Sequence, residues 1–260
     1  MKRKNNIAIL IISCDSFSDL WKPSLKNLKS YKKLSDTKTY LIGNRKKINF
    51  PGVTQILVGP DSFWTSNLKK ALLSISEDYL FVLVDDFYLI NLDKNFMLDD
   101  IATLMKKNNF FHLKFHNVPK AKNITNETNI YSYDLAEPYC VSVCGFWKKS
   151  VLQDLCHNPE SAWEFEINAS FRSSVYGATC SYLKAPFECL NLIEKGKWSR
   201  KINKNFLIQN QFEINERKFG NFFSNIVSFL KETLFHIILK INWKKRLKII
   251  NTLRKIFVVY

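Results

Sequence analysis

The sequence has no apolar run long enough to cross a bilayer. Its most apolar C-terminal stretch is interrupted by Lys231 and Glu232, whereas a spanning helix needs about 20 consecutive apolar residues. A secretory signal is also lacking, because the basic start MKRKNN leads into the short segment IAILIIS with no small-residue cleavage site after it. We therefore expect a protein that neither spans a membrane nor is exported.

Signals for disulfides and for zinc are lacking as well. The six cysteines are an even number, but a chain of this size does not need disulfides to hold its fold. Without an export signal, reduced thiols in the cytoplasm are expected. Cys140 and Cys144 have no second pair at zinc-ligand spacing, so we interpret them as core residues.

Acidic residues are nearly missing from the C-terminal quarter of the chain. Residues 195–260 contain 15 Lys and Arg against three Glu, which places +12 of the net charge of +16 there. Residues 1–194 are therefore close to neutral. A basic segment of this kind favours an anionic partner, either a membrane surface or a nucleic acid.

The length and composition fit one large soluble domain or one domain with an appendage. Hydrophobic residues make up 46% and charged residues 24% of the 260, as in ordinary globular proteins. The chain changes character near residue 221, where two aromatic-rich helices are expected over about 221–240 and 243–258. We predict a main domain over 1–220 and a basic amphipathic helical tail over 221–260.

The first third of the chain alternates between strand and helix patterns. Apolar runs predict strands over 7–13, 39–42, 54–58 and 79–84, and helical spacing of leucines predicts helices over 21–30 and 66–75. This alternation indicates an α/β fold with a parallel, Rossmann-type sheet. Ligands in such sheets bind at the carboxyl ends of the strands.

The second part of the chain is less regular. Helices are expected over 98–107, 149–156 and 162–173, strands over 110–115 and 179–183, and a polar loop over 117–129. His112 and His116 have the spacing of metal ligands on a helix, but their segment looks like a strand, where they would lie about 13 Å apart. We interpret them as residues of the core or of a substrate-binding surface, without a catalytic role.

Two adjacent carboxylates, Asp85 and Asp86, follow the apolar strand over 79–84. Buried side by side, they would repel one another and lose hydration unless a cation lay beside them. Mg²⁺ or Mn²⁺ carrying a phosphate is a suitable partner, because both ions take hard oxygen ligands. The alternative is a solvated turn in which one aspartate caps the next segment.

Several segments together resemble the GT-A class of nucleotide-sugar glycosyltransferases, in its bacterial surface-polysaccharide branch (O-antigen, capsule, lipooligosaccharide). The segment that would run from the donor-contacting loop to the metal strand is FWTSNLKKALLSISEDYLFVLVDDF. The acceptor-side segment would be CGFWKKSVLQDLCHNPESAWEFE, and a late basic loop would be NLIEKGKW. The resemblance covers residues 5–200 and implies a GT-A-like sheet. The family's Asp-X-Asp pattern is not kept, because Phe87 stands at its third position.

The resemblance implies roles for the carboxylates. Asp86 is the first choice as metal ligand, with Asp85 as a second ligand or a ribose contact. Glu166 matches the carboxylate of a Trp-X-X-Glu element and would act as the base in an inverting transfer, with Glu164 as the substitute. The alternative for Glu166 is an exposed helix-start glutamate favoured by the helix dipole.

Further residues are implied on the donor side. Lys195 and Lys197 flank Gly196 in a loop that would close over the diphosphate, with Lys197 the preferred contact; the alternative is a solvated basic turn. At the end of the first strand and at the donor rim, the candidates are Cys14, Asp15, Trp64, Ser66 and Asn67. Trp64 is equally well explained as a core anchor.

Three functions remain open on the sequence. The first is a metal-dependent glycosyltransferase that moves a sugar from a nucleotide-sugar donor to a lipid-linked or oligosaccharide acceptor, held peripherally on the inner face of the cytoplasmic membrane and not using nucleic acid. The second is a metal-dependent nucleic-acid-binding protein or nuclease that uses the basic tail. The third is an inactive sugar-binding scaffold.

The tail is expected to dock on anionic lipid. Its aromatic contacts with the interface would come from Phe222, Phe223, Phe229, Phe235 and Trp243, and its charges from Lys240, Lys244, Lys245, Arg246 and Lys248. The alternative is that these helices pack on the body or on a second subunit.

Overall fold

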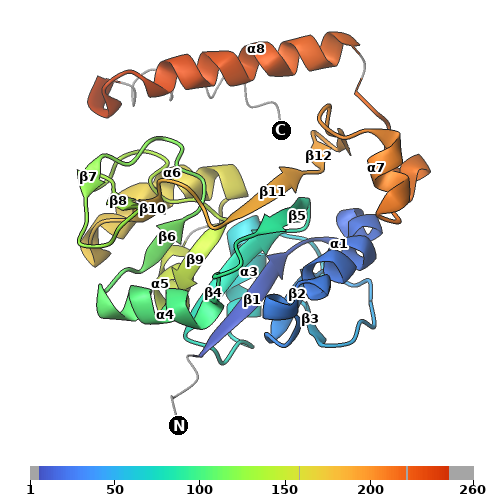
Figure 1. The fold of residues 1–260 in the computed structure, drawn as a ribbon, viewed down its shortest axis with the longest axis horizontal. Coiled ribbons are helices and arrows are strands. Elements are labelled where there is room, and N and C mark those ends of the chain that lie inside the picture. The colour runs from blue at the N-terminus through green and yellow to red at the C-terminus, as the bar shows by residue number, and fades with distance from the viewer. Residues whose placement is uncertain (1–5, 158, 221, 246–260) are drawn as a thin grey trace.

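A computed structural model describes residues 6–157, 159–220 and 222–245. Within these ranges the chain forms one mixed sheet of nine strands in the order β3-β2-β1-β4-β9-β6-β10-β8-β7, with helices on both faces. The predicted fold class, an α/β Rossmann-type sheet with a C-terminal helical appendage, is confirmed (Figure 1). No helix in the described ranges is long and apolar enough to cross a membrane.

The parallel half of the sheet matches the predicted strands and helices. Its strands are β1 (Ile7–Ile12), β2 (Thr39–Gly43), β3 (Val53–Leu57) and β4 (Tyr79–Val84), all paired in parallel. The connecting helices are α1 (Ser18–Ser30), α2 (Lys32–Ser35) and α3 (Trp64–Leu72). All six residues of β1 are buried, because a central parallel strand is covered on both faces.

The other half of the sheet is mainly antiparallel and was only partly predicted. β9 (Gly145–Lys148) pairs antiparallel with both β4 and β6 (His112–Lys114). The outer strands are β10 (Cys180–Tyr182), β8 (Ile130–Ser132) and β7 (Asn123–Ile124). The covering helices are α4 (Leu98–Lys107), α5 (Lys149–Leu155) and α6 (Ala162–Arg172), close to their expected ranges.

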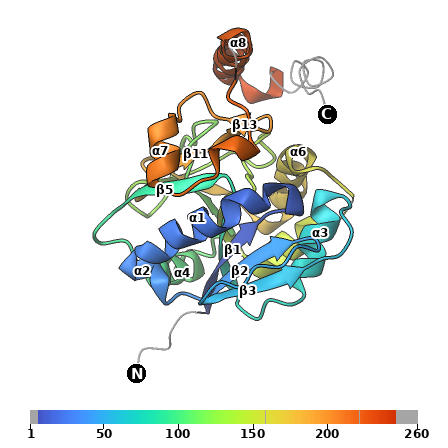
Figure 2. The same ribbon diagram turned by 90° about the vertical axis from the view of Figure 1, so that its right-hand side faces the viewer.

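Several short elements lie beyond the edge of the main sheet. They are the strand pair β5 (Phe87–Leu92) and β11 (Phe187–Asn191), the hairpin β12 (Ile193–Glu194) and β13 (Lys197–Trp198), the helix α7 (Lys204–Gln209) and the 3₁₀ turns η1 (Asp15–Phe17), η2 (Ser173–Tyr176) and η3 (Ile214–Glu216). Figure 2 shows β5, β11 and α7 on the side to which β1 runs from the N-terminus.

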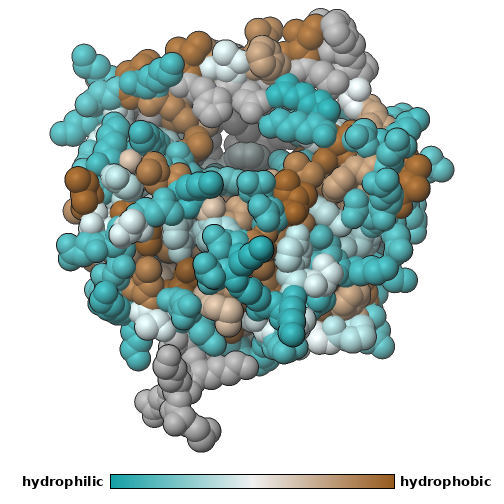
Figure 3. Space-filling view, viewed as in Figure 1, coloured by the Kyte–Doolittle hydropathy of each residue, from teal (hydrophilic) through white to brown (hydrophobic). Residues whose placement is uncertain are grey.

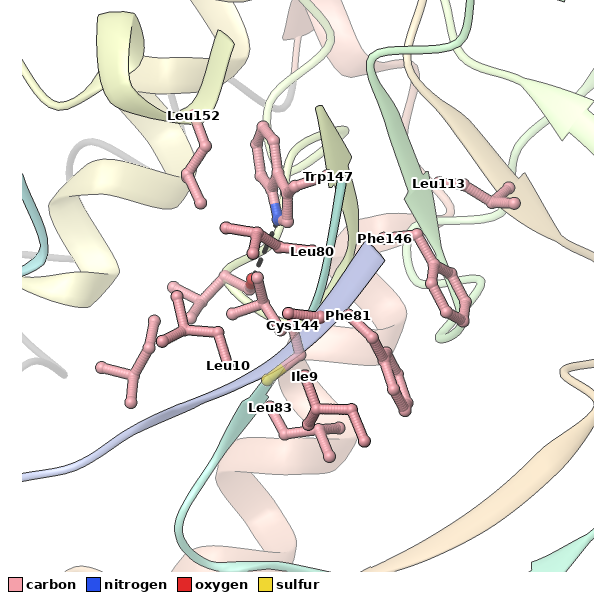
Figure 4. Close-up of a cluster of buried hydrophobic side chains, with 14 of the residues drawn as sticks. Ile9, Leu10, Leu80, Phe81, Leu83, Leu113, Cys144, Phe146, Trp147 and Leu152 are labelled. Atoms are coloured by element: carbon pink, nitrogen blue, oxygen red, sulfur yellow. Dashed lines mark hydrogen bonds between the residues drawn. The ribbon is translucent and has the colours of Figure 1, made fainter. Parts of the chain in front are cut away.

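The core lies where β1, β4 and β9 meet. Phe81 stacks on Phe146 with ring centroids 4.6 Å apart, and Cys144 points into the apolar cluster beside Ile9 and Leu83 (Figure 4). Cys140 and Cys144 are buried core residues, as predicted. Gly145 is required here, because a Cβ at this position would lie 2.8 Å from Nε2 of the buried His112.

The tail begins as α8 (Phe222–Leu239), which matches the first predicted tail helix. The second predicted helix begins with helical residues 243–245, and the rest of it lies outside the described residues. The predicted contributions of Arg246 and Lys248, and of the side chains of Phe222 and Phe223, also lie outside the described part.

Candidate active site

The candidate site lies at the carboxyl ends of β1 and β4, the central strands of the sheet. Because these strands are parallel and in register, from Ile7 beside Tyr79 to Ile12 beside Val84, the residues that follow them lie next to each other. Ser13 from the first strand therefore meets Asp85 from the second, and the Ser13 hydroxyl is hydrogen-bonded to the Asp85 carboxylate.

Asp85 is held in a buried position by a chain of hydrogen bonds. Nε1 of Trp21 in α1 donates to Oγ of Ser13 at 2.6 Å, and Ser13 in turn contacts Asp85, which is 8% exposed. Burial raises the pKa of Asp85 to about 8; the Ser13 hydrogen bond lowers it and the charge of Asp86 raises it. Asp85 is thus a positioned carboxylate rather than the solvated turn residue of the alternative interpretation.

Asp86 is more accessible than Asp85 and is the better candidate for a metal ligand. Burial raises its pKa to about 6, and the positive charge of Arg217 opposes this rise. The backbone carbonyl of Asp86 accepts a hydrogen bond from the Leu192 N–H at 2.8 Å. This bond fixes the start of the β12–β13 hairpin against the end of β4.

The two carboxylates fit a divalent cation that also carries donor phosphate. Both are partly removed from water and lie side by side, so a cation beside them would relieve desolvation and repulsion. In the described ranges, no group of three or more His, Cys, Asp or Glu could hold a metal by itself. A cation here would take one or two ligands from this pair and the others from phosphate and water.

Glu166 reaches the carboxyl edge of the sheet from the β9 side of β4, whereas Ser13 reaches it from the β1 side. Its Oε1 accepts the backbone N–H of Val143 at 3.0 Å. Val143 lies two residues before β9, and β9 pairs with β4 up to Gly145 opposite Val82. Continuing that register places Val143 level with the end of β4, directly before the aspartate pair.

The charges of Glu166 and Asp86 both act on the thiol of Cys144. Burial raises the pKa of the Cys144 thiol well above its usual value, and the charges of Glu166 and Asp86 raise it further. Burial also raises the pKa of Glu166, while the Val143 N–H and the positive charge of Lys114 lower it. Glu166 is thus not the exposed helix-start residue of the alternative interpretation.

Glu164 instead caps the helix that carries Glu166. Oε2 of Glu164 accepts the backbone N–H of Ser161 at 2.9 Å, and the Ser161 hydroxyl accepts the backbone N–H of Glu164. This reciprocal pair is a capping box at the start of α6. Glu164, the substitute base expected from the sequence, therefore caps α6.

Lys114 is a buried cation that the sequence did not single out. Its Nζ donates to the backbone carbonyls of Val118 and Tyr139 at 2.8 and 2.7 Å and lies 5.1 Å from the centre of the Tyr133 ring. Burial lowers the pKa of Lys114 to about 8, and the charge of Glu166 opposes this. Lys114 and Glu166 thus each favour the charged form of the other.

Arg217 is a second cation, close to the aspartate pair, that the sequence did not single out. Its guanidinium makes a two-pronged contact with Asp19, with both nitrogen–oxygen distances 2.7 Å, and lies 4.4 Å from the centre of the Phe17 ring. The charges of Asp85 and Asp86 also raise its pKa, after that of Asp19. Only the tertiary structure brings this residue of the C-terminal quarter to the aspartate pair.

Lys195 and Lys197 lie on the hairpin that the Leu192–Asp86 bond anchors. The expected flexible loop is a tight turn, in which Lys195 and Gly196 have φ of 51° and 73°, as in a type I′ hairpin. Lys195 is exposed and Lys197 partly buried. The hairpin is fixed by Trp198, which is 1% exposed and donates from Nε1 to the carbonyl of Ile214.

Asp15 organises the loop at the end of β2. Its carboxylate accepts the backbone N–H groups of Asn44, Arg45 and Lys46, each at 2.9 Å. Burial raises the pKa of Asp15, but these three bonds lower it below its usual value. Cys14 is beside it, with Sγ 3.0 Å from Oγ of Ser16.

The donor-rim candidates lie at the start of α3. Asn67 donates to Asp61 at 2.9 Å, and Asn44 donates to the same carboxylate at 3.3 Å, so Asp61 joins this rim to the β2 loop. Ser66 is partly buried. Trp64 packs against Phe165 with ring centroids 5.2 Å apart, which agrees with its interpretation as a core anchor and ties α3 to the helix of Glu166.

Of the two histidines, His112 lies in the core, whereas His116 lies at the carboxyl edge, next to the residue that follows Asp86. His112 is fully buried against Trp147, and burial keeps its pKa well below the usual value. His116 lies at the surface beside Phe87. Two surface hollows of about 680 and 330 Å³ lie elsewhere, at the amino ends of the strands near Thr37 and Lys38.

Comparison of the sequence with protein-family models and with curated proteins gives no match. Among solved structures, TarS 1–349 from S. aureus in complex with UDP-GlcNAc is 11% identical, with a TM-score of 0.49 over 78% of this chain and 64% of that one. The mannosyltransferase PcManGT from Pyrobaculum calidifontis, in complex with GDP-Man and Mn²⁺, is 10% identical, with a TM-score of 0.48 over 75% of this chain and 59% of that one.

A putative glucose-1-phosphate thymidylyltransferase from Bacillus anthracis is 13% identical, with a TM-score of 0.44 over 83% of this chain and 98% of that one. The chain spans only 36% of the longer TarS structure. At these scores the likenesses do not establish what the chain binds, so its function must be inferred from its own residues.

Proposed function

We propose that this protein is a metal-dependent glycosyltransferase of the GT-A type that uses a nucleoside-diphosphate sugar. The observation that carries the proposal is the arrangement at the carboxyl edge of the sheet. Asp85 and Asp86 end the central strand, and the buried end of Glu166 is fixed by Val143 at the same level. Transfer of a sugar needs both a cation site for the diphosphate and a separate carboxylate base.

In the proposed reaction, an acceptor hydroxyl oxygen attacks the anomeric carbon of the donor sugar. The bond from that carbon to the diphosphate oxygen breaks, and the nucleoside diphosphate leaves with the electron pair. Glu166 takes the proton of the acceptor hydroxyl. Its raised pKa favours this proton transfer, because a base works best when its pKa is close to the working pH. Attack opposite to the leaving group would invert the anomeric centre.

The leaving diphosphate needs positive charge around it. A divalent cation bound by Asp86, with Asp85 beside it, would neutralise part of the charge that develops there. The chain's own cations near this point are Arg217, whose charge acts on both aspartates, and Lys197, on the hairpin anchored to Asp86. Asp15 and Asp61 would shape the nucleoside side through the β2 loop and Asn67.

The proposed acceptor is a lipid-linked or oligosaccharide glycan of a bacterial surface polysaccharide, reached from the inner face of the cytoplasmic membrane. The basic tail supports a membrane-bound acceptor. The nucleic-acid alternative is less favoured, because metal nucleases usually draw on more carboxylates than one pair, and the basic tail residues alternate with aromatic and aliphatic ones.

The first experiment is a thermal-shift screen of nucleoside diphosphates with Mn²⁺ or Mg²⁺, followed by a donor-hydrolysis screen. A ligand that binds only the folded protein raises its melting temperature. Stabilisation by a nucleoside diphosphate that requires the metal supports the proposal, and stabilisation by an oligonucleotide alone favours the nuclease alternative. Binding of a nucleotide sugar without hydrolysis or transfer favours an inactive scaffold.

A further inference from the structure

Among the described side chains of α8, apolar residues lie on two faces, and the buried ones are on one of them. Residues three and four apart lie on the same side of a helix. One side, which we call the inner face, carries Phe235 and Ile238. The outer face consists of Ile226, Phe229, Leu230, Leu234 and Ile237, which are between 37% and 59% exposed.

The inner face fixes α8 against the helix of the candidate base. Ile238 is 7% exposed and packs with Ile167, the neighbour of Glu166 on α6. Phe235 meets the ring of Tyr139 edge to face, with centroids 5.9 Å apart. Beyond the helix, Nε1 of Trp243 donates to Oδ2 of Asp134 at 3.0 Å. On the outer face, the Phe229 ring meets the guanidinium of Arg200 at 5.7 Å, but all five residues of this face stay largely exposed.

The outer face combines apolar area with positive charge. Lys240, Lys244 and Lys245 follow at the end of the helix and are exposed. Figure 3 shows brown, apolar residues along the upper edge of the molecule, where α8 lies, with hydrophilic residues around them. Contiguous exposed apolar residues mark interaction sites, and aromatic and aliphatic residues beside lysines are typical of helices that lie in a lipid interface.

We propose that the outer face of α8 lies on an anionic bilayer and holds the body there through the inner face. In Figures 1 and 2, α8 lies on the side toward which β1 runs from the N-terminus, the side of the candidate site. The active edge would therefore face the lipid surface, which suits a lipid-linked acceptor; this last point rests on the proposed glycosyl transfer. Anionic lipid is favoured because the described exposed charges at the end of the helix, Lys240, Lys244 and Lys245, are positive.

The test is sedimentation of the full-length protein with vesicles of phosphatidylcholine, with or without 30% phosphatidylglycerol, at about 0.1 M salt. The double variant Leu230→Glu, Ile237→Glu should lower partitioning onto anionic vesicles at least about tenfold, because two apolar contacts are replaced by charges that lipid repels. The matched control is Leu73→Glu, Met97→Glu, which adds the same charge at apolar residues that are 71% and 44% exposed, at the end of α3 and before α4. The control should bind within about twofold of the parent.

A second variant keeps the proposal testable if the glutamates disturb the helix. Replacing Lys240, Lys244 and Lys245 by Gln should weaken anionic binding by about fivefold per lysine and leave binding to pure phosphatidylcholine unchanged. Equal binding of this variant and the parent would overturn the proposal, as would a parent protein that ignores anionic vesicles. If the glutamates instead turn a dimer into a monomer, seen by sedimentation velocity, without changing vesicle binding, the face is an interface between two copies.

The nucleotide-binding proposal is checked separately on the same samples. Melting temperature with UDP or GDP and Mn²⁺ reports the candidate site and does not need lipid. Vesicle binding without a change in melting temperature on adding nucleotide would contradict the proposed function and support the docking face. A change in melting temperature on adding nucleotide, without vesicle binding, would support the proposed function and contradict the docking face.

Discussion

At the scale of single residues, the site combines carboxylates that the fold places under electrostatic stress. Asp85 and Asp86 have pKa values raised to about 8 and about 6, because burial disfavours both ionised forms and the charge of Asp86 adds to the rise at Asp85. Strain of this kind is common at functional sites, where a ligand relieves it. Substitution of each carboxylate tests whether it serves activity or the stability of the fold.

Asp86→Asn should remove metal-dependent activity without harming the fold. We expect donor turnover to fall at least about a hundredfold and nucleoside diphosphate with Mn²⁺ to lose its effect on the melting temperature. Stability without ligand should not decrease, because a desolvated carboxylate has been removed. The control is Glu188→Gln, an exposed carboxylate on β11. Near-normal turnover of the Asp86 variant with every donor tested would refute the metal assignment.

Glu166→Gln and Glu164→Gln form a matched pair on one helix. The first should lower kcat by about 10² to 10⁴ with nucleotide binding unchanged, since the base is lost and the Val143 contact can be kept by the amide oxygen. The second should retain activity, because Gln at the same position still completes the capping box. Kinetics with a saturating donor and a nucleotide thermal shift give both readouts. The assignment is reversed if Glu164→Gln is the inactive variant.

Lys114 predicts a pH dependence of stability. Its folded pKa is lowered to about 8 from the usual value of 10.5, so between these values the unfolded chain binds more protons than the folded one. Stability should therefore rise as pH increases from about 8 toward 10.5, by on the order of 3 kcal/mol in total. Urea unfolding of the parent and of Lys114→Met at pH 7.5 and 9.5 tests this. The variant should lack this rise; equal slopes for the two proteins would contradict the prediction.

At the scale of elements, the site depends on contacts that join segments distant in the sequence. The capping box and the Val143 contact fix α6, and the pairing of Thr65 with Glu160 joins the start of α3 to the segment before α6. The hydrogen bond from Leu192 to Asp86 fixes the late hairpin. These links explain how the aspartate pair, the segment of Glu166 and the late hairpin come to share one edge of the sheet.

Arg217 is expected to be the strongest of these links. Its side chain and that of Asp19 are 9% and 12% exposed, so removal of one partner leaves the other charge poorly solvated. Arg217→Met should lower the free energy of unfolding by about 3 kcal/mol, whereas Lys218→Met, at the exposed neighbour, should change it by less than about 0.5 kcal/mol. A double-mutant cycle with Asp19→Asn measures the coupling, and additive effects would show that the pair contributes little.

At the scale of the whole molecule, charge and function are divided between two regions. The body supplies the sheet edge with its carboxylates, and the segment after residue 195 carries most of the net charge. Arg217 shows that this segment serves the site as well as the tail. The proposed division at residue 220 is therefore one of composition, because the inner face of α8 packs on α6.

Salt should distinguish the charge attraction of the lysines from the apolar contacts of α8 in membrane binding. The attraction of lysines to lipid headgroups is screened as the Debye length falls from about 10 Å at 0.1 M to about 3 Å at 1 M salt. Binding of the full-length protein to anionic vesicles should thus weaken steeply between 0.1 and 1 M NaCl. The melting temperature of the body should change little over this range, because its core is apolar. Binding that does not respond to salt would contradict the charge contribution.

The sequence alone determined the parallel half of the sheet and the aspartate pair. Buried parallel strands such as β1 and β4 are continuous apolar runs with turn residues at their ends, and this pattern is local. The first tail helix was also predictable, from its helical apolar spacing. Short strands such as β8, β9 and β13 were missed, because two to four residues carry too little pattern to distinguish a strand from a loop.

Tertiary structure decided which residues the site contains. Glu164 and Glu166 stand two apart in one motif, and only the fold directs one to a helix cap and the other to Val143 beside the end of β4. Lys114 and Arg217 carried no sequence signal, since a lysine in a strand and an arginine in a basic segment are usually solvated. Their roles arise from burial and from contacts between residues far apart in the chain, which local pattern does not encode.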